Sequence, residues 1–106
     1  MKELEKKVIN NFKLLLSQRV ALHRLIMFGS RARGDAEPDS DMDVLVVLSG
    51  SNNATVRRHV NDCAWEAGFE HGLVVSPVVV ARQSWVNGPE RYSLLAKAIE
   101  DEGIII

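Results

Sequence analysis

The chain has 106 residues, of which 46% are hydrophobic and 25% are charged, and its formal net charge is −1. This length predicts one domain over residues 1–106, and the charge argues against nucleic-acid binding, which needs a basic face. Cys63 is the one cysteine, so an internal disulfide is excluded. No apolar run reaches the roughly 20 residues that span a bilayer, and the charged first residues differ from a secretory signal. We therefore expect a cytoplasmic protein without membrane contact.

The first part of the chain predicts a helix followed by a buried strand. Residues 2–19 carry apolar side chains at helical spacing, which indicates one buried helix face. The apolar run Leu25-Ile26-Met27-Phe28 then indicates a short strand over residues 24–29. Gly29-Ser30 ends this strand, and residues 30–34 are expected to form one or two helical turns.

The turn after this strand has the residue types of a phosphate-binding site. Gly29 lacks a Cβ, so its backbone can approach a ligand closely. We expect Ser30 to cap the short helix, whose free N–H groups attract phosphate. Arg31 and Arg33 add positive charge beside it. The stretch predicts phosphate binding by Gly29, Ser30, Arg31 and Arg33.

Two carboxylates stand at the start of the next predicted strand, residues 42–48. Asp41 and Asp43 are two apart, so the period of a strand puts both side chains on one face, with Cα atoms about 6.6 Å apart. At that distance they repel by about 2 kcal/mol at an effective dielectric near 20. A divalent cation reverses the sign, and Mg²⁺ prefers one or two carboxylates plus substrate phosphates. We predict that Asp41 and Asp43 are metal ligands and catalytic residues; the alternative is two solvated acids in a turn.

The rest of the chain predicts a small α/β (α+β) fold with a mixed sheet and about three longer helices. A helix over residues 54–68, capped by Ser51 or Asn53, places Cys63 in its apolar face. A strand over residues 73–80 contains Pro77, which indicates an edge strand or a bulge. We expect Asn87-Gly88-Pro89 to open the last helix, with Ile104–Ile106 as a closing strand. The buried face of that helix is predicted to hold Tyr92, Leu95, Ala96 and Ile99.

Gly29-Ser30, ten residues, and then Asp41-Met42-Asp43 resemble the signature of the DNA polymerase beta-type nucleotidyltransferase superfamily. The segment from Gly29 to Gly34 is similar to the sequence motif that is typical of the minimal nucleotidyltransferase (MNT) branch of this superfamily. The resemblance implies transfer of a nucleoside monophosphate from a nucleoside triphosphate, with ATP the expected donor, assisted by two Mg²⁺ ions. It implies that Asp41 and Asp43 bind the metal, that Gly29 and Ser30 hold the β- and γ-phosphates, and that Arg31 or preferably Arg33 neutralises the leaving pyrophosphate.

The sequence departs from this family at the third carboxylate. Catalytic members carry it on the strand that matches residues 73–80, where this chain has no Asp or Glu. We expect Pro77 at that position, with Ser76 next to it, so the second metal is in doubt. General-base assistance is worth about 10²- to 10⁴-fold, and the missing group leaves open whether the chain is an active enzyme.

The resemblance also implies a partner. Proteins similar to the MNT branch are commonly paired with small helical HEPN-type proteins in toxin–antitoxin modules, so a HEPN-type partner is expected and is one candidate acceptor. Two functions stay open: a Mg²⁺-dependent nucleotidyltransferase, and a catalytically weak or inactive antitoxin that acts by binding its partner. A homo-oligomer is also left open.

Overall fold

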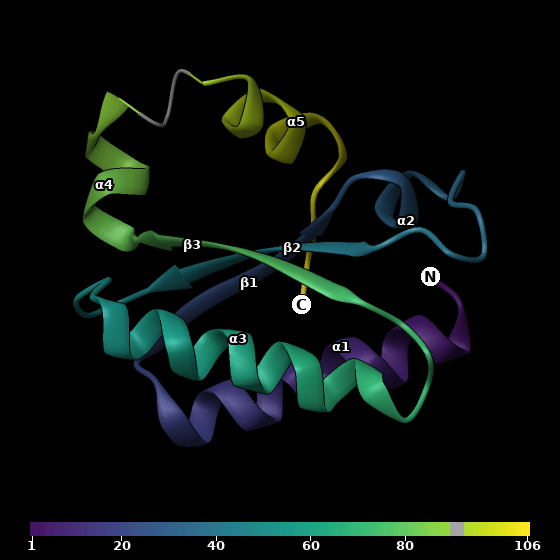
Figure 1. Cartoon of the computed structure of the whole chain (residues 1–106). Coiled ribbons are helices and arrows are strands. Elements are labelled where there is room, and N and C mark those ends of the chain that lie inside the picture. Colours follow the sequence, from purple (N-terminus) through teal and green to yellow (C-terminus); the bar gives the residue numbers. More distant parts are fainter. Residues whose placement is uncertain (90–92) are drawn as a thin grey trace.

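A four-stranded mixed sheet separates two layers of helices (Figure 1). The computed structural model describes residues 1–89 and 93–106. In chain order, the elements are α1 (Glu3–Arg19), β1 (Leu22–Phe28), α2 (Ser30–Arg33), β2 (Met42–Leu48), α3 (Ala54–Phe69), β3 (Val75–Ala81), α4 (Arg82–Asn87), α5 (Leu94–Glu102) and β4 (Ile104–Ile105). The predicted mixed sheet and its order of elements are confirmed.

The sheet order is β3-β2-β1-β4. β1 pairs antiparallel with β2 and with β4, whereas β2 pairs parallel with β3. The parallel pair is joined by α3, as a crossover connection requires. β3 therefore lies at one edge of the sheet. Proline lacks a backbone N–H, and Pro77 is tolerated here because an edge strand has one side on which no hydrogen bond to a neighbouring strand is needed. The edge position predicted from Pro77 is confirmed.

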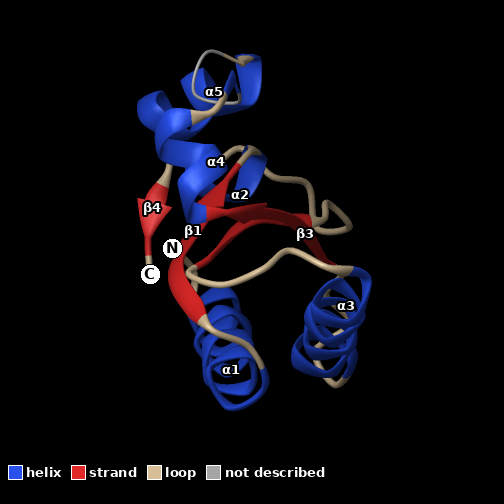
Figure 2. Cartoon of the chain, turned by 90° about the vertical axis from the view of Figure 1, so that its left-hand side faces the viewer, coloured by secondary structure: helices blue, strands red, loops and turns tan. Residues whose placement is uncertain are grey.

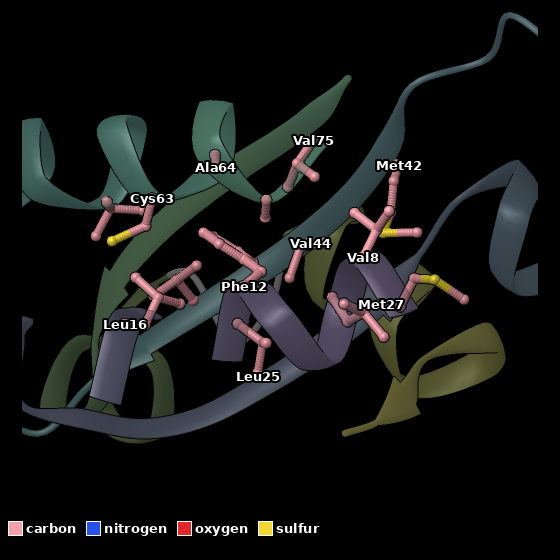
Figure 3. Close-up of a cluster of buried hydrophobic side chains, with 14 of the residues drawn as sticks. Val8, Phe12, Leu16, Leu25, Met27, Met42, Val44, Cys63, Ala64 and Val75 are labelled. Carbon is pink, nitrogen blue, oxygen red and sulfur yellow. The ribbon is translucent and has the colours of Figure 1, made fainter. Parts of the chain in front are cut away.

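The larger core lies between the sheet and the layer of α1 and α3, as Figures 2 and 3 show. Phe12 and Leu16 of α1 are fully buried and pack with Leu25 and Val44 of the sheet. Cys63 is also fully buried here, which confirms its expected place in the core. Burial raises the pKa of the Cys63 thiol and keeps it protonated.

A smaller core lies on the opposite face, beneath α4 and α5 (Figure 2). Leu45 and Val47 of β2 pack there with Ile26 of β1 and Ile99 of α5. Burial on both faces explains why β2 is apolar almost throughout. The same strand therefore holds both helical layers in place.

The C-terminal part differs from the expectation. The last helix begins at Leu94, and the hydroxyl of Ser93 caps it by accepting the Ala96 N–H at 3.1 Å. α4 was not predicted, because its six residues show no apolar period long enough to indicate a helix. Tyr92, expected on the buried face, lies outside the described residues. Within the described part of the chain, no helix is long and apolar enough to cross a bilayer.

Candidate nucleotide and metal site

The Gly29-Ser30 turn and the two aspartates meet at one end of the sheet. Phe28, the last residue of β1, pairs with Asp43 of β2, so Gly29 lies beside Asp43. Gly29 has φ 77° and ψ −160°, a conformation that is favourable for glycine alone. A Cβ at this position would also overlap the Asp43 carboxylate. Glycine is therefore required here both by the backbone and by the close approach of the carboxylate.

The short helix after this turn is the single turn expected from the sequence, but its cap differs. Gly29, and not Ser30, is the N-cap of α2, and Ser30 is its first residue. The Ser30 carbonyl accepts the N–H groups of Gly34 and Asp35 at 2.9 and 3.0 Å, which closes the turn. The prediction that Ser30 caps the helix is wrong, because the backbone turns one residue earlier. Ser30 nevertheless lies directly after Gly29, at the same end of the sheet.

Asp43 lies on the face of β2 opposite the larger core, and Asp41 directly precedes the strand. Met42 between them is fully buried against the α1 side (Figure 3), so strand alternation directs Asp43 to the other face. Asp41 is exposed, whereas Asp43 is partly buried. Burial raises the pKa of Asp43, the negative charges of Asp41 and Glu102 raise it further, and Arg33 opposes them. This concentration of negative charge fits a bound cation.

Arg33 contacts an acid that the sequence did not single out. Its Nη1 donates to Oε1 and Oε2 of Glu102 at 3.2 and 3.1 Å, and its Nε donates to Oδ2 of Asp35 at 3.2 Å. These hydrogen bonds, that to Glu102 first, raise the pKa of Arg33. The backbone N–H of Gly29 also donates to Glu102 Oε1, at 3.1 Å. Glu102 ends α5, and no local motif marks it, because it reaches the site through the tertiary fold.

Arg31, expected to contact phosphate, has another role in the structure. Its guanidinium is buried and forms an ion pair with Glu5 of α1 at 3.0 Å. It also donates to the carbonyl oxygens of Ser40 and Pro38, in the loop that leads to Asp41. Arg31 therefore joins α1 to this loop, and the charge turned toward the site is that of Arg33. The expectation for Arg31 is corrected, because a guanidinium committed to three partners is not available to a ligand.

The register of β3 also corrects the expected position of the missing carboxylate. Asp43 pairs with Ser76, and Pro77 pairs with Val44. In-register neighbours point to the same face, so Ser76 shares the face of Asp43 and Pro77 lies on the opposite face. Pro77 there lines a surface pocket with Trp65 and Phe69 of α3. Across the described residues, no three His, Cys, Asp or Glu side chains form a metal-binding cluster.

A mixed sheet that brings a Gly-Ser turn against an Asp-x-Asp strand is the arrangement of polymerase beta-type nucleotidyltransferases. Residues 9–106 match the family model described as Nucleotidyltransferase domain, and the chain belongs to that family. The resemblance seen in the sequence is therefore confirmed.

Two proteins of Methanocaldococcus jannaschii are similar to the chain in sequence. "Putative protein adenylyltransferase MJ0141" is 27% identical over 92 residues, which cover 82% of this chain and 93% of the relative. "Putative protein adenylyltransferase MJ1305" is 36% identical over 58 residues, which cover 53% of this chain and 40% of the relative. The chain is thus homologous to proteins named as adenylyltransferases.

Solved structures of toxin–antitoxin complexes share the fold. A crystal structure of a toxin–antitoxin with AMP-PNP matches with a TM-score of 0.64 at 19% identity, over 91% of this chain and 69% of that chain. A second match is to a structure of the tri-AMPylated Shewanella oneidensis HEPN toxin in complex with MNT antitoxin. Its TM-score is 0.57 at 16% identity, over 96% of this chain and 70% of the matched chain. The fold is therefore close to that of MNT antitoxins.

Proposed function

We propose that this chain is a Mg²⁺-dependent nucleotidyltransferase that transfers a nucleoside monophosphate from a nucleoside triphosphate to an acceptor hydroxyl. The acceptor hydroxyl loses its proton to solvent water and its oxygen forms a bond to the α-phosphorus. The bond between the α-phosphorus and the oxygen that bridges to the β-phosphate breaks, and pyrophosphate leaves with that oxygen. The observation that carries the proposal is the contact between the Gly29 turn and Asp43, with Arg33 beside both. It brings a backbone suited to phosphate, a carboxylate suited to metal and a cation to one place.

Asp41 and Asp43 are the proposed metal ligands. Both offer carboxylate oxygens, which suit Mg²⁺, and the pKa of Asp43 is raised by burial and by the nearby acids, so a cation would relieve its environment. Mg²⁺ held there supplies charge neutralisation for the triphosphate. The residues support one metal better than two, because the β3 neighbour of Asp43 is Ser76.

Arg33 and the Gly29-Ser30 turn are the proposed phosphate ligands. The backbone N–H of Gly29 and the Arg33 guanidinium lie near enough to share one carboxylate, that of Glu102. Two donors that converge on an anion in this way can also bind phosphate oxygens. Arg33 is then placed to stabilise negative charge on the leaving pyrophosphate, which is the electrostatic part of phosphoryl transfer.

ATP is the proposed donor and a HEPN-type protein the proposed partner and acceptor. The support comes from the relatives: two are named as protein adenylyltransferases, one similar complex contains AMP-PNP, and another pairs an MNT antitoxin with an AMPylated HEPN toxin. A protein acceptor also suits a small chain, since the partner supplies its own recognition surface.

A second candidate function is an antitoxin that neutralises its partner by contact alone. The observation that favours it is the absence of an acidic side chain from β3, where Ser76 lies beside Asp43. Without a base there, chemistry would be slow, although positioning and metal electrostatics account for most of phosphoryl-transfer catalysis.

The test begins with nucleotide binding and ends with transfer. Mn²⁺ and ATP added to the wild-type chain are expected to broaden the amide signals of Gly29, Ser30 and Asp43 in NMR spectra. Asp43→Asn is expected to abolish this broadening without unfolding the chain, whereas Asp39→Asn, the same change at an exposed loop acid, leaves it intact. Retained broadening in Asp43→Asn would contradict the metal assignment.

Transfer itself separates the two functions. A HEPN-type partner co-expressed with the chain is expected to gain the mass of a nucleoside monophosphate, measured by intact mass spectrometry. The gain is expected to be lost in Asp41→Asn and kept in Asp39→Asn. A partner that is bound and neutralised without any mass gain would support the contact antitoxin.

A further inference from the structure

Glu102 occupies the place that the proposed function gives to phosphate. Its Oε1 accepts the Gly29 N–H at 3.1 Å and a hydrogen bond from Arg33 Nη1 at 3.2 Å, while Oε2 accepts from Arg33 Nη1 at 3.1 Å. The Glu102 side chain is 19% exposed. A carboxylate and a phosphate both accept hydrogen bonds through negatively charged oxygens. The Gly29 N–H and Arg33 Nη1 therefore cannot donate to Glu102 and to a phosphate at the same time in this geometry.

The fold holds Glu102 at this position through the backbone on its C-terminal side. Gly103 follows it, and the Gly103 N–H bonds to the Ile99 carbonyl at 2.8 Å, which ends α5. A Cβ at position 103 would overlap that carbonyl, so the backbone passes very close to α5. β4 then pairs antiparallel with β1, and Ile104 lies opposite Met27.

This route explains why Glu102 reaches the turn at Gly29. β1 ends at Phe28, so the strand that fixes β4 is also the strand that delivers Gly29. The contact spans 73 positions of sequence and is set by the pairing of two strands, not by the freedom of one surface side chain. A contact positioned in this way has a defined geometry before any ligand arrives.

Glu102 is held in this position close to other negative charges, which repel it. Asp41 and Glu102 are both close enough to Asp43 for their negative charges to act on it. Arg33 pairs with Glu102 and also acts on Asp43, so its positive charge offsets these two acids. A triphosphate that used the Gly29 N–H and Arg33 would take the place of the Glu102 carboxylate, because both donors are bonded to that carboxylate.

We propose that Glu102 is an internal competitor of the triphosphate, which holds the Gly29 N–H and Arg33 until nucleotide displaces it. The proposal rests on the proposed function, since it assigns the same two donors to phosphate. Glu102 then lowers the apparent affinity for nucleotide. The site binds nucleotide only when the Glu102 contacts are broken, so the apparent affinity falls with the fraction of molecules in that open state.

Glu102→Gln tests the proposal, because glutamine keeps the shape and the oxygen acceptor but loses the charge. We expect Mg²⁺-ATP to bind roughly 10-fold more tightly to Glu102→Gln than to the wild type, as expected from the loss of one charge-assisted contact. Asp101→Asn removes the same charge from the next residue, which is exposed and pairs with Lys97 instead, and is expected to change the affinity less than about 2-fold. Calorimetric titration measures all three.

A measurement without nucleotide separates this proposal from the proposed function. The Gly29 amide signal is expected to shift in Glu102→Gln and to stay unchanged in Asp101→Asn, because only the first change alters its acceptor. An unmoved Gly29 signal would overturn the proposal whatever the nucleotide does. Wild-type binding with unchanged or weaker binding in Glu102→Gln would overturn the competitor and leave the proposed function standing. Absence of binding in every variant would overturn both.

Discussion

Replacing Arg31 with methionine is expected to destabilise the fold strongly, although Arg31 lies in the sequence motif that resembles a nucleotide site. Its guanidinium forms an ion pair with Glu5 at 3.0 Å, and the two side chains are 5% and 4% exposed. Methionine fills a similar volume but leaves the Glu5 carboxylate buried without its cation. The change therefore isolates the cost of an uncompensated buried charge.

The magnitude follows from the partners that remain. Removing one member of a buried pair costs about 3–5 kcal/mol, and Glu5 keeps one hydrogen bond, from the backbone N–H of Lys2 at 2.8 Å. We therefore expect a loss near the lower end, about 3 kcal/mol, out of a total that is typically about 5–15 kcal/mol. A double replacement, Glu5→Leu with Arg31→Met, removes both charges and is expected to recover most of this loss.

Urea unfolding followed by circular dichroism measures these differences, provided that the slope against urea is unchanged. The pH dependence gives a second check. Burial alone would raise the pKa of Glu5, but the Lys2 N–H and Arg31 outweigh it and lower the pKa. This contribution to stability is present above the ordinary value of 4.5 and is lost as the pH falls through the lowered pKa. The gap between wild type and Arg31→Met is therefore expected to shrink in acid.

A loss below about 1 kcal/mol at neutral pH would show that the pair of Arg31 with Glu5 behaves as an exposed ion pair, because that is the range of exposed pairs. A double replacement that is no more stable than Arg31→Met alone would likewise contradict the expected cost of an unpaired Glu5 charge. Either result would return Arg31 to the list of candidate phosphate ligands.

Three further changes probe the site directly. Asp43→Asn is expected to raise the melting temperature of the metal-free chain at neutral pH, because the raised pKa of Asp43 means that folding disfavours its ionised form. This gain in melting temperature is expected to vanish below pH 3.8, the ordinary pKa of the group, where the carboxyl is protonated in both states. A gain that persists in acid would contradict this explanation. Gly29→Ala is expected to cost about 1–3 kcal/mol from its backbone conformation and to abolish nucleotide binding, whereas unchanged urea unfolding would show that the conformation tolerates a side chain. Arg33→Met is expected to leave the unfolding midpoint nearly unchanged and to weaken Mg²⁺-ATP binding roughly 10-fold by calorimetry, and an equal affinity would remove Arg33 from the site.

The sequence predicted the local elements of the site because their causes are local. The Gly29-Ser30 turn, the strand 42–48 and the common face of Asp41 and Asp43 depend on side-chain period and on backbone freedom over a few residues. These features can be predicted without knowing which residues from distant parts of the sequence contact them. They also carried the resemblance to nucleotidyltransferases, which the family match confirmed.

Tertiary contacts determine which side chains meet at the candidate site. Arg31 and Arg33 are two residues apart and chemically alike, yet one pairs with α1 and the other with Glu102, because opposite sides of a single helical turn meet different elements. Likewise, the register of β2 with β3 placed Ser76, and not Pro77, beside Asp43. A shift of one residue reverses the face of a strand, and no local signal fixes it.

Glu102 shows this division most clearly. By itself, the sequence predicted a phosphate-binding turn followed by a pair of carboxylates suited to a metal, because both predictions depend on short-range geometry. It gave no indication of a competing carboxylate, because the contact of Gly29 with Glu102 joins positions 73 residues apart. Only the pairing of β4 with β1 brings them together, and that pairing depends on the whole sheet.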